Sequence, residues 1–385
     1  MFLFKLLFRN TFRHKLRTLL TVLSIVIAIL AFGLLRTVIR AWYSGVEASS
    51  ATRLVTRNAI SLIFSLPIAY KDKIRQIENV KTVSYGNWFG GIYIDEKNFF
   101  ANFAVEPRSY FQLYPEFVLS PEDKTAFLRD RRGFVAGRNL AAKYGWKIGD
   151  IITLKGSIFP GDWEFILRGI YRGKDKNADE SQFIFHWDYL NERLRKTAPG
   201  RADQVGFYMI GVTGGEVAPA VAVAIDKTFQ NSLAETLTET EKAFQLGFVS
   251  MSETIIMAIQ LVSFVVIVII LAVVANTMAM ASRERIGEYA ILKTLGFSGF
   301  QIAGLIWGES LLITLMGCTL GMAVTFPAAK AFGDAMGSFL PVFNVGRDTV
   351  YLDLAAVLVV GTSAAILPAW RAANIRIADA LRRIG

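Results

Sequence analysis

The residue types that most often perform catalysis are scarce in this chain. Its 385 residues include two histidines, His14 and His186, and one cysteine, Cys318. Neither histidine belongs to an H-E-x-x-H pair for zinc, no G-x-S-x-G turn presents a nucleophilic serine, and the spacing singles out no pair of carboxylates. His186 lies among apolar residues and is expected to be structural. We therefore predict no catalytic residue, no metal site and no enzymatic activity.

The chain also lacks the G-x-x-x-x-G-K-[ST] loop whose backbone N–H groups cradle nucleotide phosphates. We therefore expect it to bind no cofactor and to leave ATP hydrolysis to another chain. Its formal net charge of +10 could indicate nucleic acid. However, the basic residues cluster beside long apolar stretches, where membrane topology and anionic lipid headgroups explain them. We expect membrane lipids as partners and no nucleic acid.

Acidic and basic side chains gather between two of these apolar stretches. We expect Ser282 to cap a short amphipathic helix that Gly296 stops, and Ser298 with Gln301 to form a capping box that opens the next helix. The charged residues expected on the exposed face of this short helix are Arg283, Glu284, Arg285, Glu288 and Lys293. Taken alone, their spacing favours ion pairs among themselves at i, i+3 or i, i+4.

The elements that hold this segment are four apolar stretches, at 19–35, 255–281, 302–329 and 354–370. About 20 apolar residues in a helix cross ~30 Å of hydrocarbon. A cleaved signal peptide is the alternative for the first stretch. Its apolar run exceeds the usual length, however, and no A-x-A-like site follows promptly. With 53% hydrophobic residues, the chain is therefore expected to be an α-helical membrane protein of four transmembrane helices, arranged one plus three.

The orientation of these helices follows from the basic residues at the two ends. The N-terminal segment carries five of them and no acid, namely Lys5, Arg9, Arg13, Lys15 and Arg17. The tail carries four against one acid, namely Arg371, Arg376, Arg382 and Arg383 against Asp379. Because basic residues beside a span stay in the cytoplasm, both termini are predicted to be cytoplasmic.

These features divide the chain into nine segments. They are a cytoplasmic amphipathic segment (1–17), transmembrane helices at 18–40, 254–281, 301–330 and 351–370, an extracytoplasmic domain (41–253), a cytoplasmic coupling segment (282–300), a short outer loop (331–350) and a cytoplasmic tail (371–385). The first segment could lie in the membrane interface as a separate helix or continue the first span.

The large domain inserted between the first two spans is predicted to be α+β, of two lobes and without a disulfide. Strands are expected at 151–154, 165–171, 183–185 and 208–212, and helices at 139–144 and 218–229. Segments 92–94 and 99–105 flank a polar turn and are expected to pair as a β-hairpin.

Polar and small residues inside the spans are further candidates. Glu309 is costly in lipid, so it is either functional or hydrogen-bonded to a neighbouring helix near the cytoplasmic interface. Gly317 and Gly321 form a small-xxx-small pair that allows two helices to approach closely, within the chain or across a dimer. Asp353 is expected at the outer interface.

The sequence at 283–296, Arg-Glu-Arg-Ile-Gly-Glu-Tyr-Ala-Ile-Leu-Lys-Thr-Leu-Gly, resembles the coupling segment of MacB/FtsX-type ABC transporter permeases. The resemblance adds Gly287, Leu295 and Gly296 to the charged residues of this segment. It continues at 308–310, through Gly317 and Gly321, and into the tail, where Pro368, Arg371 and Leu381 belong to the family's closing signature. A segment of the outer domain, 139–154, and the one-plus-three order of the spans are similar too, also to lipoprotein-releasing permeases.

This resemblance implies a permease dimer, of two identical or two related chains, in the plasma (inner) membrane of a bacterium. A separate cytoplasmic ATPase dimer, holding ATP and Mg, would dock against 283–296, in place of the pairing among the segment's own charges. The permease would pass the ATPase motion to the outer domain, which is called mechanotransmission. We favour export or efflux with a periplasmic adaptor and an outer-membrane channel. Lipoprotein release and activation of a periplasmic hydrolase are the alternatives.

Overall fold

The computed structural model of the chain describes residues 8–175, 178–336 and 342–375. The chain divides into two compact units. A helical unit contains Met1–Arg40, Glu253–Ala335 and Phe343–Gly385, and an outer unit contains Ala41–Ser252 with Met336–Val342.

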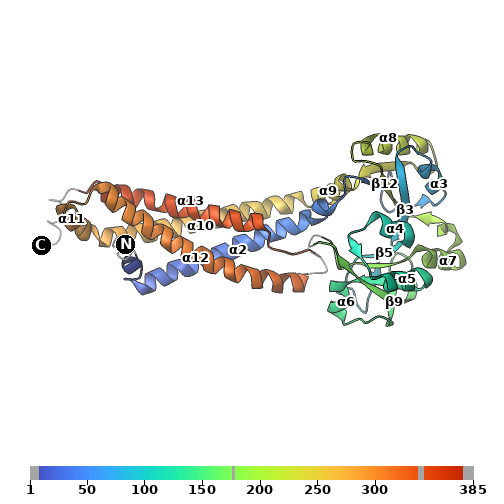
Figure 1. The fold of residues 1–385 in the computed structure, drawn as a ribbon, viewed down its shortest axis with the longest axis horizontal. Coiled ribbons are helices and arrows are strands. Elements are labelled where there is room, and N and C mark those ends of the chain that lie inside the picture. The colour runs from blue at the N-terminus through green and yellow to red at the C-terminus, as the bar shows by residue number, and fades with distance from the viewer. Residues whose placement is uncertain (1–7, 176–177, 337–341, 376–385) are drawn as a thin grey trace. The chain divides into compact units, whose positions relative to one another are not determined.

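Within the described residues, four helices are long and apolar enough to cross a membrane. They are α2 (Lys15–Ala48), α10 (Glu253–Glu284), α12 (Gly299–Met336) and α13 (Arg347–Ala373), with the short α11 (Ile286–Thr294) between α10 and α12 (Figure 1). Residues 8–11 are also helical, and a turn at 12–14 separates them from α2. The one-plus-three order of apolar helices around a large inserted unit is thus confirmed.

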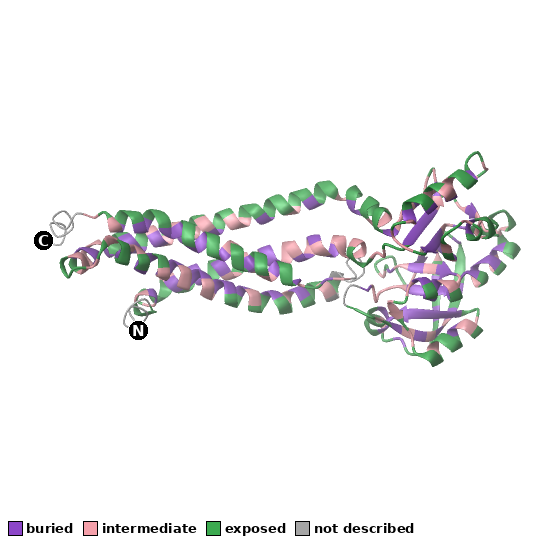
Figure 2. Cartoon of the chain, turned by 45° about the horizontal axis from the view of Figure 1, so that its top comes forward, coloured by how far each residue is buried: buried purple, intermediate pink, exposed green. Residues whose placement is uncertain are grey.

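Buried apolar residues from all four long helices meet in one core. Examples are Ile25 on α2, Val274 on α10, Ile313 on α12 and Val357 on α13. Buried and exposed residues alternate along each helix (Figure 2). Many of the exposed residues are large and apolar, among them Leu261, Phe264, Ile269, Val359 and Ile366. An apolar outer surface on such helices fits contact with lipid chains.

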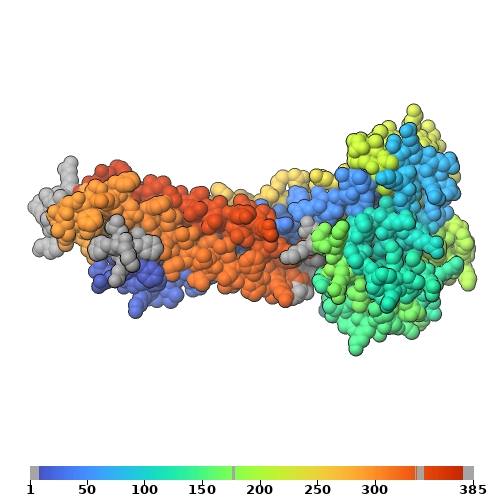
Figure 3. Space-filling model, viewed as in Figure 1, coloured from blue at the N-terminus to red at the C-terminus, as the bar shows by residue number. Residues whose placement is uncertain are grey.

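Small residues bring α12 close to both of its neighbours. A methyl group on Gly317 would lie 2.5 Å from a side-chain carbon of Ile25 on α2, and one on Gly321 would lie 2.8 Å from Ile29. On its other side, the Ser310 hydroxyl donates to the Gly361 carbonyl of α13 at 2.7 Å. Figure 3 shows α12 (orange) and α13 (red) side by side on the visible face of this unit. The contact made by Gly317 and Gly321 therefore lies within the chain.

Asp353 lies in the second turn of α13, and its place at the outer membrane interface stays a prediction. Its side chain is 1% exposed inside the bundle, and one carboxylate oxygen has no hydrogen-bond partner among the described residues. Gly33 of α2 lies against it, because a methyl group there would be 3.7 Å from the other carboxylate oxygen. The missing side chain of Gly33 leaves room for α13 to approach and cover Asp353, which the sequence of α13 alone could not indicate.

The described part of the outer unit contains an eleven-stranded mixed sheet. Its strands are β1 (Arg53–Asn58), β3 (Val80–Trp88), β4 (Gly91–Ile92), β5 (Asn102–Val105), β6 (Phe117–Val118), β7 (Gly133–Gly137), β8 (Ile151–Gly156), β9 (Gly161–Gly173), β10 (Phe183–His186), β12 (Phe207–Val212) and β13 (Thr236–Thr240). They follow the order β13-β1-β12-β3-β5-β10-β7-β9-β8-β4, with β6 on β9. Most pairs are antiparallel, but β10 runs parallel to β5 and β7 parallel to β9. One sheet extends through the unit, and its division into two lobes stays a prediction.

Short helices cover both faces of this sheet. They are α3 (Tyr70–Arg75), α4 (Pro107–Leu113), α5 (Pro121–Arg129), α6 (Arg138–Tyr144), α7 (Trp187–Thr197), α8 (Ala218–Phe229) and α9 (Glu241–Met251). The small strands β2 (Leu66–Pro67) and β11 (Gln204–Val205) pair separately. The strands expected at 151–154, 165–171, 183–185 and 208–212 and the helices expected at 139–144 and 218–229 are confirmed.

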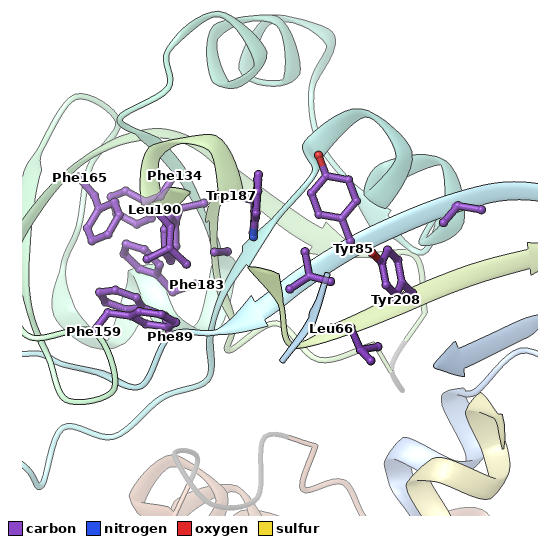
Figure 4. Close-up of a cluster of buried hydrophobic side chains, with 14 of the residues drawn as sticks. Leu66, Tyr85, Phe89, Phe134, Phe159, Phe165, Phe183, Trp187, Leu190 and Tyr208 are labelled. Atoms are coloured by element: carbon purple, nitrogen blue, oxygen red, sulfur yellow. The ribbon is translucent and has the colours of Figure 1, made fainter. Parts of the chain in front are cut away.

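Alternation along the central strands explains why both faces are covered. Phe183 and Phe185 of β10 point into one core and Ile184 into another, as the two-residue period of a strand requires. The first core is rich in aromatic rings, and Phe134 and Phe183 stack with ring centroids 3.9 Å apart (Figure 4). A strand that is apolar on both faces is stable only between two layers.

The β-hairpin expected from 92–94 and 99–105 is wrong. Strand β4 pairs with β8, while β5 pairs with β3 and β10. The side chain of Asn102 takes the place of a strand partner, because it accepts from the Gly91 N–H at 2.7 Å and donates to the Gly91 carbonyl at 2.9 Å. This side-chain clamp satisfies the backbone locally and leaves both strands free to pair elsewhere.

His186 is structural, as expected. Its side chain is buried, and Nε2 lies 2.7 Å from the Phe127 carbonyl oxygen. Burial lowers the pKa of His186 below its usual value.

Candidate functional site

The start of α11 differs from the expectation. Helix α10 continues through Ser282 to Glu284, and the chain bends at Arg285 before α11 begins at Ile286. Ser282 is therefore inside α10 and is buried, so it does not cap α11. The buried stripe of α10 continues through Ala281 into Ser282, and this packing overrides the local preference of serine for a cap.

The end of α11 follows the sequence closely. Gly296 has a φ of +92°, its N–H donates to the Lys293 carbonyl at 3.1 Å, and the Phe297 N–H donates to the Leu292 carbonyl at 3.0 Å. These two bonds define a Schellman motif. The predicted capping box follows, since the Ser298 N–H donates to the Gln301 side chain at 2.9 Å and the Gln301 N–H donates to Ser298 Oγ at 3.3 Å. Helix α11 is thus joined to α12 by a tightly closed turn.

The sequence predicts Arg285 on the exposed face of α11, but the structure buries it. It is 3% exposed, and its guanidinium donates to the carboxylate of Glu309 on α12 at 2.7 Å. A second N–H donates to the Asn10 carbonyl at 2.8 Å. The bend before α11 turns Arg285 inward, where a buried charge requires a partner. Of the two roles open for Glu309, the structure has the hydrogen bond to a neighbouring segment.

Glu284 and Glu288 pair with the basic N-terminal segment rather than with their own neighbours. Arg17 donates to Glu284 at 2.5 Å, and Arg13 forms an ion pair with Glu288. The Arg13 and Glu288 side chains are about half exposed, and exposed pairs of this kind contribute only about 0–1 kcal/mol. Such pairs can open without a large loss of stability. Their carboxylates are therefore available to a partner.

Lys293 also turns inward instead of facing solvent. Its ammonium donates to the carbonyls of Ala373 and Ile375, at 2.7 and 2.9 Å. These groups lie at the end of α13, where carbonyls lack partners within the helix. A lysine there satisfies them and complements the helix dipole. Together with Arg285, this contact attaches α11 to α12 and α13.

Exposed apolar side chains lie beside these charges. Ile291 is 50% exposed, Leu295 70% and Phe300 88%. Ile291 also lines a groove of about 240 Å³ together with Glu288, Tyr289 and Glu309. Burial raises the pKa of Tyr289 to about 12. Sequence reasoning missed Ile291 and Phe300, although apolar residues on the outer side of a charged helix were the available signal.

The remaining predicted residues lie on α10, α11 and α13 or outside the described part. Gly287 is in the first turn of α11, and Arg283 is exposed at the end of α10. Pro368 is buried inside α13, and Arg371 lies in its last turn. Leu381 lies outside the described residues.

Residues 260–377 match the FtsX-like permease C-terminal family. This match covers most of α10 and the whole of α11, α12 and α13. The chain carries an FtsX-like permease domain. The chain is also 26% identical over 329 residues to an uncharacterized ABC transporter permease of Methanocaldococcus jannaschii, covering 81% of this chain and 79% of that protein.

Solved structures that are similar to this chain include two domains of transporters. The extracellular domain of YknZ, a noncanonic ABC-type transporter from Gram-positive bacteria, is 9% identical, with a TM-score of 0.33, and covers 49% of this chain and 99% of that one. The periplasmic region of MacB from Actinobacillus actinomycetemcomitans is 9% identical, with a TM-score of 0.37, and covers 53% of this chain and 95% of that one. The family match thus covers the C-terminal helices, and four helices among the described residues are long and apolar enough to cross a membrane.

Proposed function

We propose that this permease transmits the motion of a separate ATPase dimer to its outer unit and thereby drives export or efflux. The observation that carries the proposal is the attachment of α11. Arg285 joins the start of α11 to Glu309 on α12, and Lys293 joins its end to the last carbonyls of α13. A displacement of α11 therefore has to move these two spans or break buried polar contacts.

The surface around α11 supports docking of an ATPase here. Ile291, Leu295 and Phe300 offer an apolar contact, and Glu284 and Glu288 add carboxylates whose present pairs are exposed. An apolar centre with charges at its rim is the usual composition of a protein interface. ATP and Mg would be held by the ATPase, and ATP hydrolysis would take place there.

The setting of this permease is part of the same proposal. Both termini and α11 would lie in the cytoplasm of a bacterial cell, with the outer unit on the other side of the inner membrane. Two permease chains, identical or related, would meet one ATPase dimer. A periplasmic adaptor and an outer-membrane channel would complete an efflux complex. Release of a lipoprotein or activation of a periplasmic hydrolase would use the same coupling.

The test is to purify the permease with its ATPase and to measure their association and ATP turnover. Glu288→Arg is expected to weaken association by about tenfold or more, because it places a like charge beside Arg13 and removes a carboxylate from the docking surface. The matched control is Glu192→Arg, which places a like charge beside Arg131 in an exposed ion pair of the outer unit. This control should change neither the association with the ATPase nor the ATP turnover.

A charge-swapped double variant separates docking from local structure. Arg13→Glu combined with Glu288→Arg restores the exposed ion pair but not the carboxylate on α11. We expect association to stay weak in this variant. Normal association and undiminished ATP turnover in Glu288→Arg would overturn the assignment of α11 as the docking element.

A further inference from the structure

The outer unit contains a groove of about 740 Å³ that the coupling proposal does not use. Its walls come from residues 41–49, from α9 and from the segments around Phe117 and Asp179. All of these residues belong to the outer unit. The groove combines an apolar wall with a group of acidic side chains.

One cation among the described lining residues, Arg53, is fully committed to structural contacts. Its guanidinium donates to Glu241 at 2.6 Å and to Glu116 at 3.1 Å, and it lies 4.3 Å from the centroid of the Tyr114 ring. A third bond goes to the Leu113 carbonyl at 2.9 Å. Two carboxylates thus already outweigh the charge of Arg53, so the lining residues that the structure describes leave no unpaired cation to attract an anion.

Asp179 adds a third carboxylate that is held by neutral donors. One oxygen accepts from the Ser181 N–H at 2.7 Å and from the Ser181 hydroxyl at 2.6 Å, and the other accepts from the Gln182 side-chain amide at 3.1 Å. Burial raises the pKa of Asp179 above its usual value. A cation beside this carboxylate would therefore be stabilising.

Gln182 offers a second acceptor at the same place. Its amide nitrogen is used by Asp179, while its buried Oε1 has no hydrogen-bond partner within the described part of the chain. A buried acceptor without a donor costs free energy. A ligand that brings N–H donors would satisfy this atom and the Asp179 carboxylate together.

Another part of the groove is apolar, so it can bind the apolar part of the same ligand. Trp42, Phe117, Phe248 and Val249 line it, and Phe248 is 46% exposed. Apolar and aromatic side chains of this kind bind an alkyl or aromatic group, and the rings also attract an ammonium.

We propose that this groove binds an amphiphilic ammonium compound. Its N–H groups contact Asp179 and Gln182 Oε1, and its apolar part lies against Trp42 and Phe248. Such a ligand can be a free cationic amphiphile or the headgroup of an aminophospholipid. The meaning of this site for export rests on the proposed function, but binding itself needs no ATPase.

The test uses the full chain in phosphatidylcholine nanodiscs without an ATPase, with octylammonium and octyl sulfate as probes. Calorimetric titration, corrected with empty nanodiscs, should detect octylammonium and not octyl sulfate. Asp179→Asn should weaken octylammonium binding by about tenfold. Asp188→Asn, at an exposed acid outside the groove, should leave it unchanged.

A second variant separates a loss of binding from a loss of the fold. Phe248→Ala truncates a half-exposed wall residue and should weaken octylammonium binding several-fold while the thermal unfolding temperature stays the same. Equal binding of both probes, or normal binding by both Asp179→Asn and Phe248→Ala, would overturn the proposal. Neither outcome would contradict the proposed coupling role of α11, because that role is tested by association with the ATPase.

Nanodiscs that contain phosphatidylethanolamine distinguish the two sources of the ammonium. If the headgroup occupies the groove, this lipid should weaken apparent octylammonium binding in the natural chain and not in Asp179→Asn. If it has no effect while octylammonium still binds, the ligand is a free amphiphile.

Discussion

At the scale of single residues, the buried pair of Arg285 and Glu309 is the contact most sensitive to substitution. The two side chains are 4% and 10% exposed. Bringing two charges out of water is costly, so the pair is not a large net source of stability. Removing one partner is different, because the other charge then stays buried alone.

Glu309→Leu is therefore expected to destabilise the helical unit by about 3–5 kcal/mol. The double variant Arg285→Met, Glu309→Leu should recover much of this loss, since it removes both charges. Thermal unfolding in detergent measures both effects. Arg13→Gln, which breaks only an exposed pair, is the control and should change the unfolding temperature little. A double variant as unstable as Glu309→Leu would contradict the account.

At the scale of elements, the turn between α11 and α12 depends on a left-handed residue. Gly296 has a φ of +92°, and a methyl group there would meet nothing within 4 Å. The cost of a side chain at this position is thus conformational and not steric. The turn fixes where α12 begins relative to the end of α11.

Gly296→Ala should weaken this turn by about 1 kcal/mol. Hydrogen exchange is expected to become faster for the amides of Gly296 and Phe297, whose bonds close the Schellman motif. The matched control is Gly304→Ala inside α12, which also has open space around it but no positive φ. That substitution should be neutral or slightly stabilising. Equal exchange in both variants would show that the left-handed turn does not hold α11.

At the scale of the whole molecule, the packing of α12 decides how the spans are held together. Gly317 and Gly321 lie against Ile25 and Ile29 of the same chain. This contact holds the span before the outer unit against one of the three that follow it, without involving a second copy.

Gly317→Ala is therefore expected to lower the thermal unfolding temperature by several degrees while leaving the mass of the purified assembly unchanged. The physical reason is that the new methyl group would lie 2.5 Å from Ile25, so the two helices have to separate. Light scattering measures the mass, and Gly304→Ala is again the control. Dissociation of the assembly without a change in unfolding temperature would place the contact between chains instead.

Local signals explain which features could be read from the sequence. Hydropathy located the four long helices, since each span carries its own apolar stretch. The end of α11 can also be predicted from the sequence, because Gly296, Ser298 and Gln301 act over only three or four residues. The same holds for the strands and helices of the outer unit that have a regular two-residue or 3.6-residue pattern.

The partners of the polar residues were decided only by the tertiary structure. Arg285 finds Glu309 at a distance of 24 positions, and Lys293 finds Ala373 at 80. The failed hairpin and the acidic groove also depend on contacts beyond the next turn of the chain. Asn102 bonds Gly91, 11 positions away, and Asp179 lines the groove with side chains from several segments. Short-range propensity acts along the chain, whereas ion pairs and cavities depend on which segments the packed core brings together.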